Sequence, residues 1–243
     1  MFLTIDKPGL PGYLVRVLTA LWLFAAALPA DAGTLHGRLT GGAGDLSELV
    51  VSLEEGPSLP PVEATAADRN MYQRRKQFSP KVTAVRAGTP LRFENQDDVF
   101  HNVFSLDKRN PFDLGLYKGS TRFADDKRTP ADGGEPAVTF STAGAYPVFC
   151  NIHPDMTGTV FVLDHGYFAR AGKDGAFELP VPDSGVVTLL VQGPSLAKPV
   201  RQSVTLPVEG IVEVGVRGKR FALTKPHSRK DGSQYGGAYG GRE

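Results

Sequence analysis

The chain has 243 residues and a formal net charge of +1, with basic and acidic side chains in nearly equal number. This balance excludes a strongly basic surface of the kind that binds nucleic acid. Glycine and proline are frequent, with 28 and 19 copies, and they separate short runs of β-branched and aromatic residues, which indicates an all-β protein.

The first element is an apolar stretch at residues 17–28, which follows Lys7 and Arg16 and precedes Ala30-Asp-Ala32. Basic residues, an apolar run and small residues at a cleavage site are typical of a secretory signal peptide. The run is shorter than the roughly 20 residues that a membrane-spanning helix needs. We therefore expect a signal peptide at residues 1–32, cleaved after Ala32, and a periplasmic or secreted protein whose mature chain has no membrane span.

Short apolar runs bounded by turn residues follow the leader. They predict strands at 34–39, 49–53, 82–85, 91–93, 138–140, 146–150 and 159–163. Such spacing favours a β-sandwich or barrel. Residues 33–65 should supply N-terminal β-strands, and the sequence does not indicate which domain they join. Residues 66–165 should form one β-domain, in which 68–78 is predicted as an irregular or briefly helical connection and 105–136 as a charged cover beside the site.

The pattern changes after Asp164. Further alternating runs predict strands at 176–179, 187–191 and 211–217. Residues 166–223 are therefore expected to form a second, smaller β-sandwich. Residues 224–243 are rich in glycine and polar side chains without an apolar period, so a disordered tail is predicted there.

Side chains that can bind a metal cluster in the segment Cys150-Asn-Ile-His153-Pro-Asp-Met156. Cys150 is the only cysteine, and the chain has only five histidines and three methionines, so this spacing is not expected by chance. His101, far upstream, could complete a set of one thiolate, two imidazoles and one thioether, which is the donor set of a blue-copper centre. The alternative is that Cys150 is a buried small hydrophobe, His153 a loop residue and Met156 a core side chain.

If the protein is exported, the presence of a single cysteine, Cys150, needs an explanation. Oxidising compartments favour disulfides, and this thiol has no cysteine partner in its own chain. Coordination of the thiolate by a metal would protect it. A reactive thiol and an intermolecular disulfide are the competing interpretations.

Residues 66–165 resemble the cupredoxins of the plastocyanin, amicyanin and pseudoazurin type. The resemblance rests on His101-Asn-Val, on Gly144-Ala-Tyr-Pro-Val-Phe-Cys150, on the Cys-x-x-His-x-x-Met loop and on Gly158-Thr-Val. It implies a Greek-key β-sandwich or barrel that holds one type 1 copper ion. It also implies that His101, Cys150 and His153 are equatorial ligands, that Met156 is the axial ligand, and that redox partners dock near His153.

The segments 71–80 and 112–117, together with the trailing β-part, resemble a bacterial subgroup whose members are often labelled methylamine-utilisation or plastocyanin-like proteins, with a carboxypeptidase-regulatory-like β-domain. Three neighbours of the ligands are expected to support the site. Asn102 could hydrogen-bond across to the Cys150 loop, although a turn-forming asparagine is an equal alternative. Phe149 would keep water from the sulfur, although aromatic core packing alone would also explain it, and Pro154 would stiffen the ligand loop. The remaining histidines, His36, His165 and His227, have no partner at ligand spacing.

These observations predict a periplasmic type 1 copper protein that carries single electrons between redox partners. The sequence has no GxSxG, HExxH, Walker or dinucleotide-binding motif, so we expect no enzymatic activity. A copper-binding protein for delivery, storage or sensing is the alternative. A third hypothesis is a structural metal site beside an adhesion or carbohydrate-binding sandwich.

Overall fold

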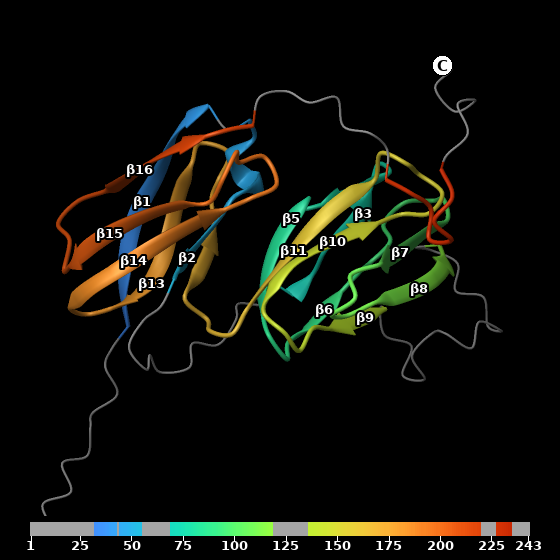
Figure 1. Ribbon diagram of the computed structural model, residues 1–243, viewed down its shortest axis with the longest axis horizontal. Coiled ribbons are helices and arrows are strands. Elements are labelled where there is room, and N and C mark those ends of the chain that lie inside the picture. The colour runs from blue at the N-terminus through green and yellow to red at the C-terminus, as the bar shows by residue number, and fades with distance from the viewer. Residues whose placement is uncertain (1–31, 43, 55–68, 119–135, 220–226, 235–243) are drawn as a thin grey trace, which may run out of the picture.

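A computed structural model describes most of the chain as two groups of β-sheets joined side by side (Figure 1). The described residues are 32–42, 44–54, 69–118, 136–219 and 227–234. They form sixteen strands and one short 3-10 helix, η1 (Leu46–Glu48), and contain no α-helix. In this part of the chain no helix is long and apolar enough to cross a membrane. The predicted signal peptide at 1–32 lies outside it, except for Ala32.

The first group centres on a five-stranded sheet with the order β5-β11-β10-β7-β8. These strands are β5 (Val82–Arg86), β11 (Thr157–Leu163), β10 (Gly144–Phe149), β7 (His101–Ser105) and β8 (Phe112–Tyr117). Strand β11 runs parallel to β5 and antiparallel to β10. In β10 the side chains alternate, with Tyr146 and Val148 fully buried, so one face of the sheet packs inward.

Two strand pairs complete this first group. They are β6 (Pro90–Arg92) with β9 (Ala137–Thr139), and β3 (Tyr72–Arg74) with β4 (Gln77–Ser79). One apolar core joins them to the five-stranded sheet through Leu91 of β6, Phe78 of β4 and Tyr146 of β10. This arrangement is the β-sandwich that the sequence predicted for residues 66–165.

The β3–β4 hairpin corrects the prediction of an irregular or helical connection at 68–78. Its turn residues Arg75 and Lys76 have φ angles of 54° and 57°. A two-residue turn with both φ values positive matches the twist of the flanking strands, but it usually carries asparagine or glycine. Arginine and lysine gave no such signal, which is why the hairpin was not expected.

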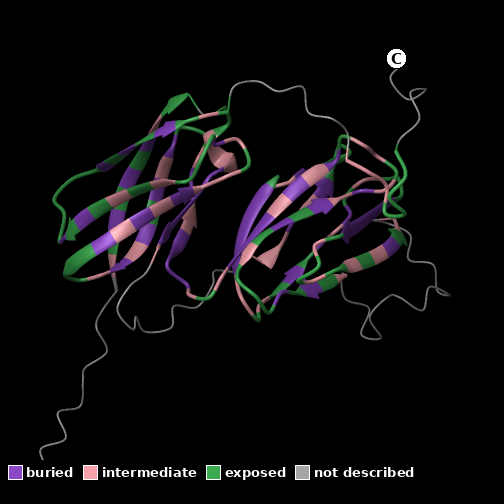
Figure 2. Cartoon of the chain, in the orientation of Figure 1, coloured by how far each residue is buried: buried purple, intermediate pink, exposed green. Residues whose placement is uncertain are grey.

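The second group is a sandwich of two sheets with the orders β13-β1-β16 and β12-β2-β14-β15. The strands are β1 (Ala32–Gly42), β13 (Ala176–Pro182), β16 (Val212–Arg217), β12 (Phe168–Arg170), β2 (Val50–Leu53), β14 (Gly185–Gln192) and β15 (Val200–Leu206). Burial alternates along β14 and β16, as Figure 2 shows, and the buried side chains form a second apolar core.

The first two strands answer the question that the sequence left open. Strand β1 lies between β13 and β16, and β2 lies between β12 and β14. The described part of residues 33–65 therefore belongs to the C-terminal sandwich. The chain leaves this sandwich after β2, builds the first group of sheets, and then returns.

A small apolar cluster joins the two groups of sheets. It consists of Val50 from β2, Phe168 from β12, Val82 and Ala84 from β5, and Phe161 from β11. At its border Lys81 Nζ lies 3.4 Å from Glu48 Oε1. The strand that follows the ligand loop, β11, thus contributes to both the first core and the contact with the second sandwich.

A close approach at Gly37 gives a test of the second core. A Cβ atom at Gly37 of β1 would lie 2.1 Å from Cζ of Phe177, which is buried in the paired strand β13. We expect Gly37→Ala to displace this ring and to lower the free energy of unfolding by about 1–3 kcal/mol, as overpacking usually does. Denaturant unfolding followed by circular dichroism measures it.

The same strand offers a matched control. Nothing lies within 4 Å of a Cβ atom built at Gly42, so Gly42→Ala should leave the stability nearly unchanged. Equal effects of the two substitutions would contradict the assigned packing of Phe177 over Gly37.

Candidate metal centre

The predicted ligands come from two places that the first sheet brings together. His101 is the first residue of β7, and Cys150 directly follows β10, its neighbour in the sheet. His153 and Met156 lie in the short loop that leads from β10 to β11. Hydrogen bonding between β7 and β10 is what places His101 beside a loop about 50 residues further along the chain.

Three donor atoms converge at this end of the sheet. Cys150 Sγ lies 3.5 Å from His153 Nδ1 and 3.8 Å from His101 Nδ1, and the two Nδ1 atoms are 3.0 Å apart. Among the described residues, His101, Cys150 and His153 form one group whose possible ligand atoms all lie within 4.8 Å of one another. A thiol and two imidazoles converging on each other fit the equatorial donor set of a type 1 copper site.

The four candidate donors differ in how far they are buried. His101, Cys150 and Met156 are completely buried, whereas His153 is only partly buried. Met156 belongs to the same apolar core cluster as Cys150, so its thioether and the thiol lie in the same apolar surroundings. Burial lowers the pKa of His153, and His101 and Lys76 lower it further, which favours the neutral imidazole that can bind a metal.

The backbone of the ligand loop is closed by two hydrogen bonds. The N–H of Cys150 donates to the carbonyl of Met156 at 3.1 Å, and the N–H of Met156 donates to the carbonyl of His153 at 3.0 Å. Pro154 lies in the turn between His153 and Met156, where its fixed φ restricts the loop. The loop therefore holds its three donors in one compact turn.

A carboxylate that the sequence did not single out holds the upstream imidazole. Asp97 Oδ2 lies 2.8 Å from His101 Nε2 and also accepts the backbone N–H of Lys76 at 2.8 Å, while Asp97 Oδ1 accepts the N–H of Arg75 at 2.6 Å. A proton on Nε2 leaves the Nδ1 lone pair facing Cys150 and His153, so Asp97 selects the metal-binding tautomer. The unexpected β3–β4 turn supplies the two backbone donors.

The charge of Asp97 is maintained by these same contacts. Burial acts to raise the pKa of Asp97, but hydrogen bonds from Lys76, His101 and Arg75 outweigh it and lower the pKa below the usual value. The carboxylate is therefore ionised at neutral pH and can form a charge-assisted hydrogen bond with His101. The sequence signal was an acidic residue four positions before a ligand histidine, but Asp98 beside it made that signal ambiguous.

Asn102 connects the two ligand segments. Its Oδ1 accepts a hydrogen bond from the backbone N–H of Asn151 at 2.6 Å, and its Nδ2 donates to Asp113 Oδ1 at 3.1 Å. Because Asn102 follows His101 and Asn151 follows Cys150, this contact ties one ligand strand to the other. Phe149, on the other side of Cys150, packs against Phe104 of β7 with ring centroids 5.7 Å apart.

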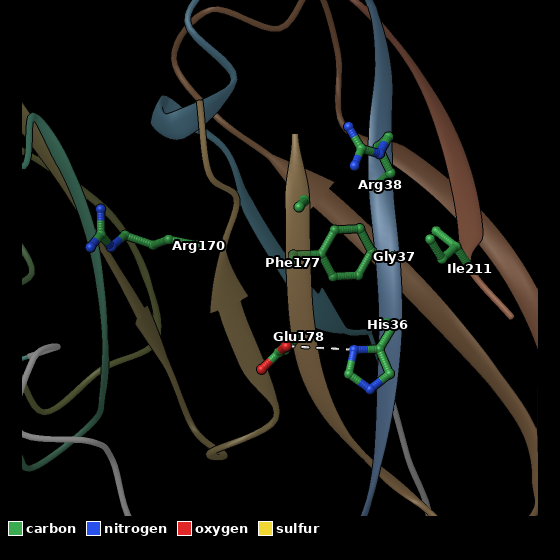
Figure 3. Close-up of a pocket in the computed structure, with 8 residues that line it drawn as sticks. His36, Gly37, Arg38, Arg170, Phe177, Glu178 and Ile211 are labelled. Carbon is green, nitrogen blue, oxygen red and sulfur yellow. Dashed lines mark ion pairs between the residues drawn. The ribbon is translucent and has the colours of Figure 1, made fainter. Parts of the chain in front are cut away.

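The other histidines lie elsewhere. His36 of β1 faces Glu178 of β13 at 3.5 Å, on the rim of a groove of about 440 Å³ on the second sandwich (Figure 3). Both side chains are mostly exposed, with 60% and 75% of their surface accessible, so this pair is an ordinary surface contact. The ring nitrogens of His165 contact Asp164 and the backbone of Tyr167. His227 lies near the metal centre and stacks on Phe149.

Comparison with known proteins agrees with this geometry. Residues 65–163 match the family model of copper binding proteins of the plastocyanin/azurin family. No curated protein sequence matches the chain.

Several solved structures of copper proteins are similar to part of the chain. A purple cupredoxin from Nitrosopumilus maritimus is 22% identical, with 39% of this chain covering 98% of that protein and a TM-score of 0.30. A reduced amicyanin variant is 20% identical, with coverage of 46% and 98% and a TM-score of 0.31. A copper-containing nitrite reductase from Thermus scotoductus SA-01 is 22% identical over 51% of this chain and 27% of that protein, with a TM-score of 0.31.

Proposed function

Because residues 65–163 match the family model of copper binding proteins of the plastocyanin/azurin family, we propose that this protein is an exported type 1 copper protein that carries single electrons between redox partners. The observation that carries the proposal is the convergence of Cys150 Sγ with the Nδ1 atoms of His101 and His153 at the buried end of the sheet. Met156 would be the fourth, axial donor.

The residues fit a site that changes little between oxidation states. When bound, copper supplies a one-electron couple, and the protein's part is to hold the donors still. Asp97 holds the His101 ring, Asn102 holds the Asn151 backbone, and the two backbone bonds around Met156 hold the loop. Prearranged ligands reduce the rearrangement that accompanies electron transfer.

The surface around His153 supports a docking role. His153 is the partly exposed member of the donor group, and several apolar side chains next to the ligand histidines are exposed: Val99 by 39%, Phe100 by 39% and Ile152 by 43%. Exposed apolar residues gathered at one end of a domain are typical of a protein-binding surface. We propose that redox partners bind here, and that the site carries out electron transfer rather than enzymatic turnover.

Copper delivery, storage or sensing is the second candidate. It needs donors that a recipient can reach, as the partial exposure of His153 allows. Three fully buried donors argue against it, because copper would have to leave a closed site. Rapid loss of copper to a competing chelator without unfolding would favour delivery.

Voltammetry and electron self-exchange test the proposed function. Copper-loaded protein should give a reversible one-electron wave, and Ile152→Lys should slow self-exchange between copies by about 10-fold or more, because like charges meet where apolar surfaces should dock. NMR line broadening in mixtures of the two oxidation states measures this rate. Val186→Lys is the matched control, since Val186 is 68% exposed on the second sandwich. A copper-loaded sample without a reversible wave would refute electron transfer.

A further inference from the structure

The C-terminal segment at residues 227–234 lies against the copper-binding domain rather than the sandwich that precedes it. Figure 1 shows this segment, in red, beside β7 and β8. It contains its own turn, in which Arg229 N–H donates to the Ser233 carbonyl and Gly232 N–H donates to the Arg229 carbonyl, each at 2.8 Å. The prediction of a disordered tail at 224–243 is therefore corrected for residues 227–234, and the rest of that range lies outside the described residues.

Lys230 joins this segment to the bridge between the ligand strands. Its backbone N–H donates to Asn151 Oδ1 at 3.0 Å, and its Nζ lies 2.7 Å from Asp113 Oδ2. Asp113 Oδ1 accepts from Asn102 Nδ2, and Asn102 Oδ1 accepts from the Asn151 N–H. The four residues thus form a closed ring of hydrogen bonds that includes the neighbours of both His101 and Cys150.

His227 makes a second, apolar contact with the same region. Its ring stacks on Phe149 at a centroid distance of 4.6 Å and meets Phe104 edge-on at 6.0 Å. All five residues of β7 are buried, although only one face of this strand can point into the first core, where Val103 lies. Asn102 and Phe104 point to the opposite face, and the C-terminal segment helps to bury it.

We propose that residues 227–234 support the copper centre, and that Lys230 and His227 are positioning residues for the strands that carry the ligands. Lys230 restrains the Asn151 side chain and Asp113, which hold the Asn102 bridge between His101 and Cys150. His227 restrains Phe149, the residue before Cys150. This inference rests on the proposed copper site, because positioning has a purpose only if these strands carry ligands.

The ring and the stacked imidazole act together. The side chains of Lys230 and Asp113 are 47% and 38% exposed, so their ion pair alone contributes little. Lys230 and His227 hold the same short segment against the sheet, so each contact keeps the other in place and their effects are not additive. The double variant should therefore have a larger effect than the sum of the two single ones.

The test compares Lys230→Met, His227→Ala and the double variant in the full chain. Without copper, NMR should show faster hydrogen exchange of the Asn151 amide in the double variant, by about 10-fold. With copper, release to a chelator should also accelerate about 10-fold, the lower end of the effect of losing a group behind a metal ligand. The EPR spectrum of the double variant should differ from that of the unmodified protein.

Conservative variants and a distant lysine provide the controls. Lys230→Arg with His227→Phe keeps the charge and the stacking and should restore both rates. Lys198→Met, on an exposed residue of the second sandwich, should change neither. Unchanged Asn151 exchange in the double variant would overturn the inference. A chain that fails to bind copper would refute the proposed function, while the exchange measurement on copper-free protein still decides whether the segment positions the strands.

Discussion

Replacing Cys150 with serine should abolish the intense visible absorption of the oxidised, copper-loaded protein. That absorption comes from charge transfer between a thiolate and copper, and a serine hydroxyl cannot provide a soft, ionised sulfur donor. Copper affinity should fall by about 100-fold or more, beyond the effect of losing a group that only supports a ligand. Optical spectra and chelator competition on the two proteins measure both quantities.

Met156→Leu is the informative companion to the serine variant. Leucine fills a similar volume in the core, so the fold should be retained, and the absorption band should persist because an axial thioether is a weak ligand. Intense absorption in Cys150→Ser would show that the thiol is not the equatorial donor. Loss of the band in both variants, with the fold intact, would indicate a different arrangement of donors.

Replacing Asp97 with asparagine should raise the reduction potential of the copper centre. Asparagine keeps an oxygen acceptor for His101 Nε2–H but has no negative charge. The carboxylate of Asp97 stabilises the more positively charged oxidised state, so its loss should favour the reduced state. A charge-assisted hydrogen bond is worth about 1.5–3 kcal/mol, and only part of it distinguishes the oxidation states. Since 100 mV corresponds to about 2.3 kcal/mol per electron, we expect a rise on the order of 50 mV, measured by voltammetry.

Asp98→Asn separates this local effect from a general change in charge. Asp98 is adjacent but exposed, and an exposed charge is screened by water and salt. Its removal should shift the potential by much less than the removal of Asp97, whose side chain is only 14% exposed. A fall in potential in Asp97→Asn, or an equal rise in both variants, would contradict the assigned role of Asp97.

The location of the metal centre could be predicted because most of its chemistry is local in the sequence. Cys150, His153 and Met156 occupy one loop between two strands, and their residue types are rare in this chain. The strands that carry them alternate clearly, so their all-β character was also readable. His101 could be named as a candidate from its residue type, but its assignment as a ligand needed the resemblance to known copper proteins, because spacing alone does not connect residues about 50 positions apart.

The contacts of Asp97 and Lys230 were not predictable, because they depend on pairings between distant segments, whereas a contact of Asn102 with the Cys150 loop was among the expectations from the sequence. Asp97 is held by the β3–β4 turn, whose Arg75 and Lys76 lack the usual turn signature. Lys230 reaches Asp113 across 117 positions of the chain. No local periodicity reports such contacts, since each side chain alone resembles an ordinary exposed charge.

The sequence by itself determined the strand-rich architecture and indicated the candidate donors in the loop from Cys150 to Met156, because local alternation and residue type decide these properties. Only the tertiary structure decided that β1 and β2 complete the C-terminal sandwich, and that residues 227–234 return to the sheets that carry the candidate metal centre. The physical reason is that backbone hydrogen bonds between strands are the same for every sequence. Which strands become neighbours in a sheet therefore depends on which apolar faces can be buried together in the completed fold.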